Sequence, residues 1–207
     1  NGVRPEGGGT GEPILRLVGV EKAFEGRKVL DGITLDIPRE RITAIIGLSG
    51  AGKSVLLKHM IGLLKPDRGQ VFVDGSDINR LSKKELYEIR RRFGMLFQSG
   101  ALFDSLTVFD NVAFPLREKT ELAEGEIGER VLRILRTVGL EGTQGKYPDE
   151  LSGGMVRRVA LARAVVMGPE IILFDEPTTG LDPIIRNSIL GLVRRTYEES
   201  RFTMVMV

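Results

Sequence analysis

One eight-residue segment constrains the fold of this chain more than any other. It is rich in glycine, ends in Lys-Ser and fits the pattern G-x-x-x-x-G-K-[ST]. Its residues are Gly47, Leu48, Ser49, Gly50, Ala51, Gly52, Lys53 and Ser54, and we call it the phosphate loop. Glycines let successive backbone N–H groups turn toward phosphate oxygens, and the N-terminus of a following helix adds partial positive charge. The pattern therefore predicts a strand, a phosphate-binding loop and a helix, in that order.

The flanking residues agree with this order. Residues 42–46 form a continuous apolar run, which is typical of a strand covered on both faces. A helix is expected to begin at Gly52 or Lys53 and to end near Leu64, before a proline. In a nucleotide site, Lys53 would reach the β- and γ-phosphates and the Ser54 hydroxyl would bind Mg²⁺. The alternative is a glycine-rich turn without a ligand.

Two acidic residues follow a second apolar run. Asp175 and Glu176 come directly after residues 171–174, Ile-Ile-Leu-Phe. Open α/β folds bind ligands at the carboxyl ends of their parallel strands. We therefore expect Asp175 to hold Mg²⁺, directly or through water, and Glu176 to polarise an attacking water. An ordinary polar strand end is the alternative, and the phosphate loop makes it the weaker one.

A third glycine-rich element is Leu-Ser-Gly-Gly-Met, residues 151–155. Ser152 has the character of a helix N-cap, and Gly153 and Gly154 leave backbone N–H groups accessible. This arrangement predicts a second anion site at the start of a helix. The simpler interpretation is a glycine-rich cap without a ligand.

The remaining pattern alternates strands with helices. Strands are expected at residues 33–37, 71–73 and 93–97, and helices at 82–92, 127–138, from Ser152 to about Met167 and from Asp182 onward. Ser82 and Glu85 form a capping box. We expect an α/β fold with a mostly parallel sheet, helices on both faces and a small antiparallel sheet in the first third. Residues 1–12 are expected to be a flexible tail, with one domain over 13–207.

Composition excludes several functions. The 207 residues carry a net charge of only +2, so a polybasic nucleic-acid-binding surface is not implied. The chain has no cysteine, which excludes thiol catalysis and cysteine-bound metals. No apolar run approaches the roughly 18 residues that a membrane span needs. The basic cluster at residues 90–92 is interpreted as a solvated helix end.

Together, the phosphate loop, the later Leu-Ser-Gly-Gly and the strand ending in Asp-Glu resemble an ATP-binding-cassette (ABC) ATPase over about residues 13–207. In that family two cassettes enclose two ATP molecules. The resemblance implies that Ser152, Gly153 and Gly154 of one cassette contact the γ-phosphate held by Lys53 of the other. Met155 stands where the family usually has Gln, which puts any contact of that amide in doubt.

The resemblance assigns further roles. Phe24 matches the aromatic that stacks on adenine, Gln98 the glutamine that touches Mg²⁺ and water, and Asp182 a loop at the dimer interface. Taken alone, these residues would be a core aromatic, a loop residue and a helix cap. The family's switch histidine has no counterpart before Val207, so we expect a truncated chain that hydrolyses ATP weakly. The single histidine, His59, is interpreted as a helix-face residue.

Residues 97–117 resemble the cassettes of bacterial phospholipid transporters, which work with proteins that carry mammalian-cell-entry domains. The implied protein is a homodimeric ATPase on the cytoplasmic face of the inner membrane, bound to a membrane permease and with no nucleic-acid partner. A helical subdomain is expected over about 100–165. Five apolar residues could form the permease socket or subdomain core: Leu102, Phe103, Leu106, Phe109 and Phe114. The alternatives are transport of another substrate, a soluble ABC ATPase or a nucleotide-sensing module.

Overall fold

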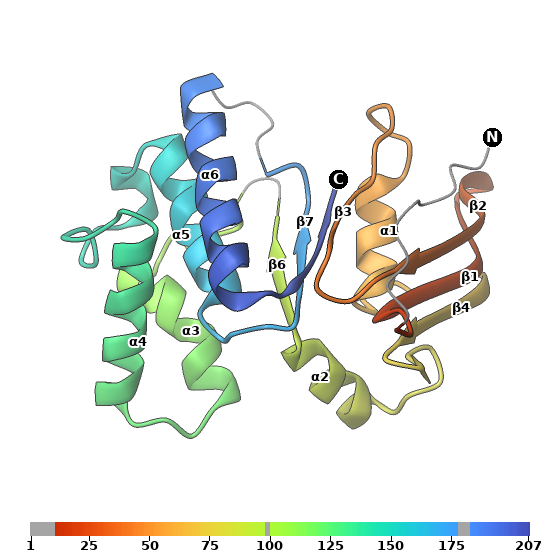
Figure 1. Ribbon diagram of the computed structural model, residues 1–207, viewed down its shortest axis with the longest axis horizontal. Helices are drawn as coiled ribbons and strands as arrows, with labels where there is room; N and C mark the ends of the chain where they lie inside the picture. Colours follow the sequence, from red (N-terminus) through yellow and green to blue (C-terminus); the bar gives the residue numbers. More distant parts are fainter. Residues whose placement is uncertain (1–10, 98–99, 178–182) are drawn as a thin grey trace.

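The computed structural model describes residues 11–97, 100–177 and 183–207 and contains two sheets (Figure 1). The antiparallel sheet has the order β2-β1-β4-β5, and the parallel sheet the order β3-β8-β7-β6. The strands are β1 (Leu15–Phe24), β2 (Arg27–Ile37), β3 (Ile42–Ala44), β4 (Arg68–Val73), β5 (Ser76–Asp77), β6 (Phe93–Leu96), β7 (Ile171–Phe174) and β8 (Thr203–Met206). The predicted α/β fold with a small antiparallel sheet is confirmed. Most of the predicted tail, residues 1–10, lies outside the described residues.

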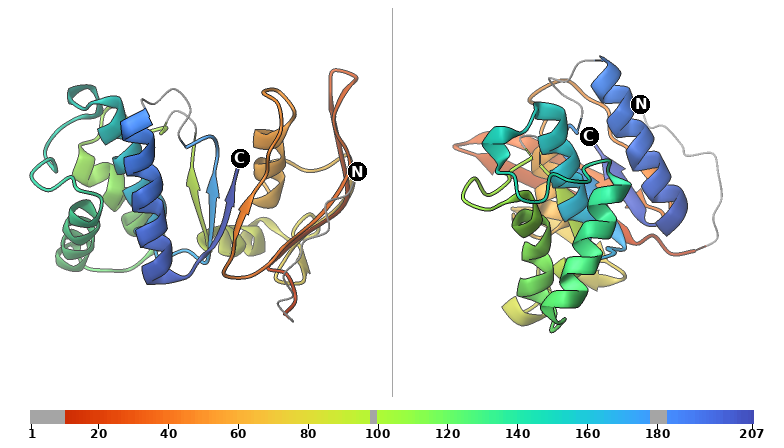
Figure 2. Two further views of the ribbon diagram at one scale, coloured as in Figure 1. Left: turned by 45° about the horizontal axis from the view of Figure 1, so that its top comes forward. Right: turned by 90° about the vertical axis from the view of Figure 1, so that its left-hand side faces the viewer.

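Strand β7 separates two hydrophobic cores. Its four residues are all buried, as the continuous apolar run predicts. Ile171 and Leu173 pack into the core on the side of helix α1 (Lys53–Met60) and the antiparallel sheet. Ile172 and Phe174 pack on the opposite side, against helices α5 (Gly153–Val165) and α6 (Pro183–Ser200). The parallel sheet is therefore a middle layer with helices on both faces (Figures 1 and 2).

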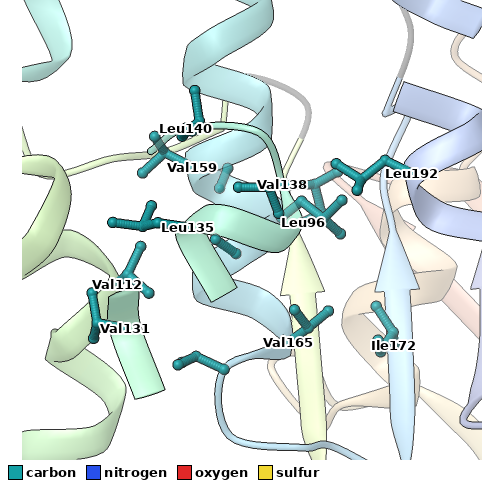
Figure 3. Packing of buried hydrophobic residues seen from close by; sticks show 14 of the residues in the cluster. Leu96, Val112, Val131, Leu135, Val138, Leu140, Val159, Val165, Ile172 and Leu192 are labelled. Carbon is teal, nitrogen blue, oxygen red and sulfur yellow. The ribbon is translucent and has the colours of Figure 1, made fainter. Parts of the chain in front are cut away.

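The larger core lies on the α5 side of the sheet. Helices α3 (Val108–Lys119) and α4 (Glu124–Thr137) pack there with α5 (Figure 3). On α4 the buried residues are Ile127, Val131 and Leu135, the spacing that the sequence predicts. Strand β6 approaches α5 so closely that a Cβ at Gly94 would lie 2.2 Å from the Ala164 carbonyl oxygen. Within the described ranges, no helix is both long and apolar enough to cross a membrane.

Helix α1 is shorter than predicted. It ends at Met60 rather than near Leu64. The reason is Gly62, which adopts the left-handed conformation with φ 69°. Its N–H donates to the His59 carbonyl oxygen at 3.0 Å, and the Leu63 N–H turns back to the Lys58 carbonyl oxygen at 2.8 Å. Glycine in this conformation is a common helix terminator, and it acts here before the proline.

The prediction that residues 42–46 are covered on both faces is wrong. Strand β3 spans only three of them and pairs with β8 at the edge of the described sheet. Ile42 is 45% exposed and Ile46 is 95% exposed. An apolar run indicates a buried strand, but its position within the sheet depends on which other strands pair with it.

The prediction of a solvated helix end at residues 90–92 is also wrong. Helix α2 (Lys83–Arg91) begins with the expected capping box of Ser82 and Glu85, but its last arginines are engaged. Arg90 donates to the carbonyl oxygens of Ile61 and Gly62. Arg92 pairs with the carboxylates of Asp74 and Glu170. The cluster therefore ties the end of α2 to α1, β4 and the segment before β7.

Candidate functional site

The phosphate loop lies between β3 and α1, as predicted. Gly50 and Gly52 have φ angles of 78° and 86°, a region that L side chains rarely adopt. Gly52 also lies against strand β2, where a Cβ would come within 2.9 Å of the Val29 side chain and 3.0 Å of its carbonyl oxygen. The loop therefore needs glycine at this position for both its conformation and its packing.

Lys53, the first residue of α1, folds back over the loop. Its Nζ donates to the carbonyl oxygens of Gly47 and Leu48, each at 3.0 Å. The same Nζ lies 3.9 Å from Glu176 Oε1. An ammonium group on a flexible stem can exchange carbonyl partners for phosphate oxygens. The structure thus places the positive charge of Lys53 within the loop and beside the Glu176 carboxylate at the end of β7.

Ser54 and Asp175 are joined directly. The Ser54 hydroxyl donates to Asp175 Oδ1 at 2.6 Å, across 121 positions of sequence. Asp175 is 6% exposed, and its N–H donates to the Leu96 carbonyl oxygen at 2.9 Å. Mg²⁺ prefers oxygen ligands and is usually held by one or two protein groups plus phosphates. A hydroxyl and a carboxylate side by side at the start of α1 fit that cation.

Glu176 has an unusual backbone. Its φ is 47°, in the left-handed region that non-glycine residues seldom occupy. The Glu176 N–H donates to the Val207 carbonyl oxygen at 3.2 Å. This geometry turns the chain at the end of β7 and puts the carboxylate of Glu176 on the Lys53 side. Its role toward a water molecule stays a prediction.

Ser152 caps helix α5 as expected. Its Oγ accepts from the Met155 N–H at 3.3 Å, and the helix begins at Gly153. Ser152 and Gly153 are both exposed, and no atom would lie within 4 Å of a Cβ at Gly153. Met155 packs partly buried against the larger core. The Met side chain thus fills an apolar position. The start of the helix is open to solvent at Ser152 and Gly153, but Gly154, which was also expected to be accessible, is buried.

Phe24 is the last residue of β1 and is 41% exposed. The alternative interpretation, a core aromatic of the small sheet, is therefore wrong. One neighbour of the ring is Lys22, whose Nζ lies 5.6 Å from the ring centroid. Gln98 and Asp182, the other two residues assigned by resemblance, lie outside the described residues. The roles of all three stay predictions.

Two arginines of α5 hold the backbone on either side of positions 98–99. Arg157 donates to the Phe97 carbonyl oxygen at 3.2 Å, and Arg163 to the Gly100 carbonyl oxygen at 2.8 Å. Burial lowers the pKa of each guanidinium below its ordinary value, which still leaves it charged at neutral pH. Sequence reasoning missed these contacts, because nothing in the local pattern shows which carbonyls a helix arginine reaches.

Four of the five apolar residues of the predicted socket divide into two groups, and the fifth, Leu106, is half-buried. Leu102 and Phe109 pack against the larger core. Phe103 and Phe114 are 44% and 39% exposed, and their ring centroids lie 4.8 Å apart. Buried Asn111 holds the backbone of Phe103, since its side chain accepts from the Phe103 N–H and donates to the Phe103 carbonyl oxygen. Two adjacent aromatic rings are therefore partly exposed to solvent.

His59 is buried rather than lying on an open helix face. Its Nδ1 is 2.7 Å from the Val55 carbonyl oxygen, and among the described residues its Nε2 has no hydrogen-bond partner. Burial lowers its pKa below the ordinary value of 6.5. The side chain is thus a buried part of α1.

Comparison with known proteins agrees with this geometry. Residues 30–179 match the family described as ABC transporter. The chain is 52% identical over 181 residues to the intermembrane phospholipid transport system ATP-binding protein MlaF of Haemophilus influenzae, covering 87% of this chain and 69% of that protein. It is also 52% identical over 170 residues to the probable ribonucleotide transport ATP-binding protein mkl of Mycobacterium leprae. That match covers 82% of this chain but only about half, 49%, of the mycobacterial protein.

Solved structures give the same result. One is cbiO1 of Clostridium perfringens, part of an ABC transporter complex, with a TM-score of 0.84, 34% identity and coverage of 95% of this chain and 78% of that one. Another is a dimeric ATP-binding cassette in a post-hydrolysis state with ADP and Pi, with a TM-score of 0.84, 34% identity and coverage of 93% and 87%. With the family match over residues 30–179, these likenesses show that the chain belongs to the ABC transporter family, as an ATP-binding-cassette ATPase.

Proposed function

We propose that this protein binds Mg²⁺-ATP at the phosphate loop and hydrolyses it to power a membrane transporter. The observation that carries the proposal is the 2.6 Å hydrogen bond from Ser54 to Asp175. It joins the loop suited to phosphates with the strand end suited to Mg²⁺, and Lys53 and Glu176 lie alongside. A glycine-rich turn without a ligand would not need these four side chains to converge.

Each residue then has a separate task. Backbone N–H groups of residues 47–54 cradle the phosphates, while Lys53 leaves its carbonyl partners for the β- and γ-phosphates. Ser54 and Asp175, with Gln98, would hold Mg²⁺, and the bound cation would neutralise charge on the phosphates. Glu176 orients and polarises the attacking water. Phe24 stacks on the adenine through its exposed face.

We infer a sandwich of two cassettes in a homodimer. The exposed Ser152 and Gly153 of one copy would meet the γ-phosphate held by Lys53 of the other, with Asp182 at the same interface. The support is the open start of α5, whose backbone N–H groups suit an anion. The dimeric cassette with ADP and Pi bound offers a structural precedent.

The transported substrate is proposed to be phospholipid. The support is the 52% identity to the H. influenzae protein named for intermembrane phospholipid transport. In that setting the ATPase would lie on the cytoplasmic face of the inner membrane and bind a permease through the exposed pair Phe103 and Phe114. A protein with a mammalian-cell-entry domain would be a further partner.

A second candidate substrate is a ribonucleotide. It is favoured by the equal identity to the mycobacterial protein, whose name says probable ribonucleotide transport. To decide, the ATPase would be purified with its membrane partner and the bound small molecules identified by mass spectrometry. Stoichiometric phospholipid beyond the detergent background, together with vanadate-sensitive ATPase activity, supports the proposal. Bound ribonucleotide would favour the alternative, and a pure complex without ATPase activity would contradict both.

A further inference from the structure

The hairpin of β1 and β2 presents Phe24 at its tip. The turn consists of two residues, Glu25 and Gly26, whose φ angles of 49° and 78° are both left-handed. Positive φ at both central positions is the geometry of a type I′ hairpin turn. A two-stranded tip of this kind is held only weakly by its own ladder. The position of the Phe24 ring therefore depends on what anchors the end of β1.

Asp67 anchors the last residues of β1 on the edge of the strand that faces β4. Pairing of β1 with β4 stops at Glu21 and Arg68. Beyond that point the Asp67 N–H donates to the Glu21 carbonyl oxygen at 2.9 Å. The Asp67 carboxylate accepts from the Ala23 N–H at 2.7 Å and from Lys22 Nζ at 2.7 Å. Asp67 thus continues the hydrogen bonding along this edge of β1 as far as Ala23, the residue before Phe24.

The same hairpin is also held at the phosphate loop. Val29 of strand β2 packs against Gly52, because a Cβ added at Gly52 would lie 2.9 Å from the Val29 side chain. Asp67 lies in the connection that leaves the other end of α1, which ends at Met60. The hairpin is therefore fastened near both ends of the helix that begins with Lys53. This two-point attachment holds the strand end that carries Phe24 relative to the phosphate-binding backbone.

We propose that Asp67 is a positioning residue that holds Phe24 at the correct offset from the phosphate loop for the adenine ring of ATP. The inference deepens the proposed function and rests on it. Lys22 supports the arrangement, because its ammonium group bonds Asp67 while lying 5.6 Å from the Phe24 ring centroid. Hydrogen bonds from Lys22 and Ala23 lower the pKa of Asp67, so the carboxylate stays charged at neutral pH.

A tryptophan reporter tests this directly. The chain has no tryptophan, so Phe24→Trp creates a single fluorophore at the hairpin tip. In that background, Asp67→Ala should lower the fluorescence anisotropy of the indole and weaken ATP binding by about 3- to 10-fold, the worth of one or two such hydrogen bonds. Binding of inorganic tripolyphosphate, which has no base, should not change. Asp67→Asn should be intermediate, because its amide oxygen can still accept from Ala23 but carries no charge for Lys22.

Asp36→Ala is the matched control. The exposed carboxylate of Asp36, on β2 of the same hairpin, pairs with Arg16 at 2.8 Å. Arg16 lies in the half of β1 away from Phe24. This variant should keep the anisotropy and the ATP affinity. In the original chain, the effect of Asp67→Ala on ATP affinity should disappear when Phe24 is already alanine. That coupling separates positioning of the ring from general loosening of the fold.

Three results would overturn the inference. Asp67→Ala could leave ATP affinity unchanged, weaken tripolyphosphate binding as much as ATP binding, or weaken ATP binding equally with and without Phe24. Failure of the proposed function looks different, since the parent chain would then bind neither ATP nor tripolyphosphate. If Asp67→Ala fails to fold, the comparison of Asp67→Asn with Asp36→Ala decides by the same criteria.

Discussion

The Ser54 hydroxyl bonds Asp175 Oδ1 at 2.6 Å and so connects the first turn of α1 with the end of β7. The carboxylate is 6% exposed, which makes this hydroxyl an important partner for a buried charge. In the proposed function, Ser54 and Asp175 would both hold Mg²⁺, and the cation would then compensate the Asp175 charge in place of the hydroxyl. We therefore expect the same contact to influence both the stability of the fold and the metal dependence of nucleotide binding.

Ser54→Ala should weaken ATP binding in the presence of Mg²⁺ and leave binding in excess EDTA nearly unchanged. The reason is that the hydroxyl acts through the cation rather than on the phosphates directly. The variant should also unfold more easily, by about 1–3 kcal/mol, because Asp175 loses its donor. Isothermal titration with and without Mg²⁺ and a urea denaturation curve measure the two effects. Ser54→Thr keeps the hydroxyl and should retain the metal dependence; equal losses with and without Mg²⁺ would argue against a Mg²⁺ ligand.

Lys53→Ala should remove most ATP affinity, by about 10- to 100-fold, since it deletes a charge-assisted contact to the β- and γ-phosphates. Lys58→Ala on the same helix is the control and should bind ATP as the parent does. A titration with fluorescent nucleotide measures both. Unchanged affinity in Lys53→Ala would disprove the assignment of the phosphate loop.

Glu176→Gln should keep ATP binding and lose hydrolysis by about 10²–10⁴-fold, the usual effect of removing a positioned base. The amide also removes a negative charge near the γ-phosphate, so Mg²⁺-ATP should hold two copies together. Steady-state ATPase assays and light scattering at high protein concentration test both points. Glu170→Gln, just before the other end of β7, should hydrolyse ATP normally. A variant that hydrolyses at the parent rate would contradict the assigned role.

A comparison of Ser152→Ala with Ser82→Ala separates the effect of losing a helix cap from the effect of losing a contact to the γ-phosphate. Each serine caps a helix through the same kind of bond, at 3.3 Å to the N–H three residues on. Both variants should lose about 1 kcal/mol of unfolding free energy. Only Ser152→Ala should also lose ATPase activity, because only that cap is proposed to meet the γ-phosphate of the other copy. Parallel losses of activity in both variants would assign Ser152 a purely structural role.

Local signals predicted the elements that depend on adjacent residues. The run Ile171–Phe174 is the observed β7, because four consecutive apolar residues before two carboxylates suit a fully covered strand. The capping box of Ser82 and Glu85 is present as predicted, since it involves only neighbouring backbone. The candidate site followed from the same kind of signal, a motif whose spacing alone sets the order of strand, loop and helix.

Features that depend on distant partners were not predictable. The exposure of Ile42 follows from the position of β3 in the sheet, which no local pattern encodes. The three bonds of Asp67 require a loop to reach the end of a strand more than 40 positions earlier. The early end of α1 has a local cause, because Gly62 adopts the left-handed conformation that ends a helix, whereas Pro66 sets only the latest possible end.

His59 should make stability fall as the pH drops below about 7. Burial places its folded-state pKa below 6.5, so folding favours the neutral ring and stability falls as pH drops from 6.5 toward the folded pKa. The slope can reach about 1.4 kcal/mol per pH unit for one proton. Charges near the ring are Lys22, which lowers its pKa, and Asp67, which raises it. The pKa values of carboxylates such as Asp110 and Glu170 are lowered from ordinary values of 3.8 and 4.5. These groups therefore change the stability only at lower pH than His59 does.

Because His59 is the only histidine, substitution isolates its contribution. His59→Leu keeps an apolar side chain in the core of α1 and should flatten the pH profile between about 5 and 7, whatever its absolute stability, because only a titrating group produces a slope. Urea denaturation of both proteins at half-unit pH steps measures this. All other titrating groups are common to both proteins, so their contributions cancel in the comparison. A parent profile that stays flat down to pH 5, or a slope that survives in His59→Leu, would show that the ring is not held neutral by burial.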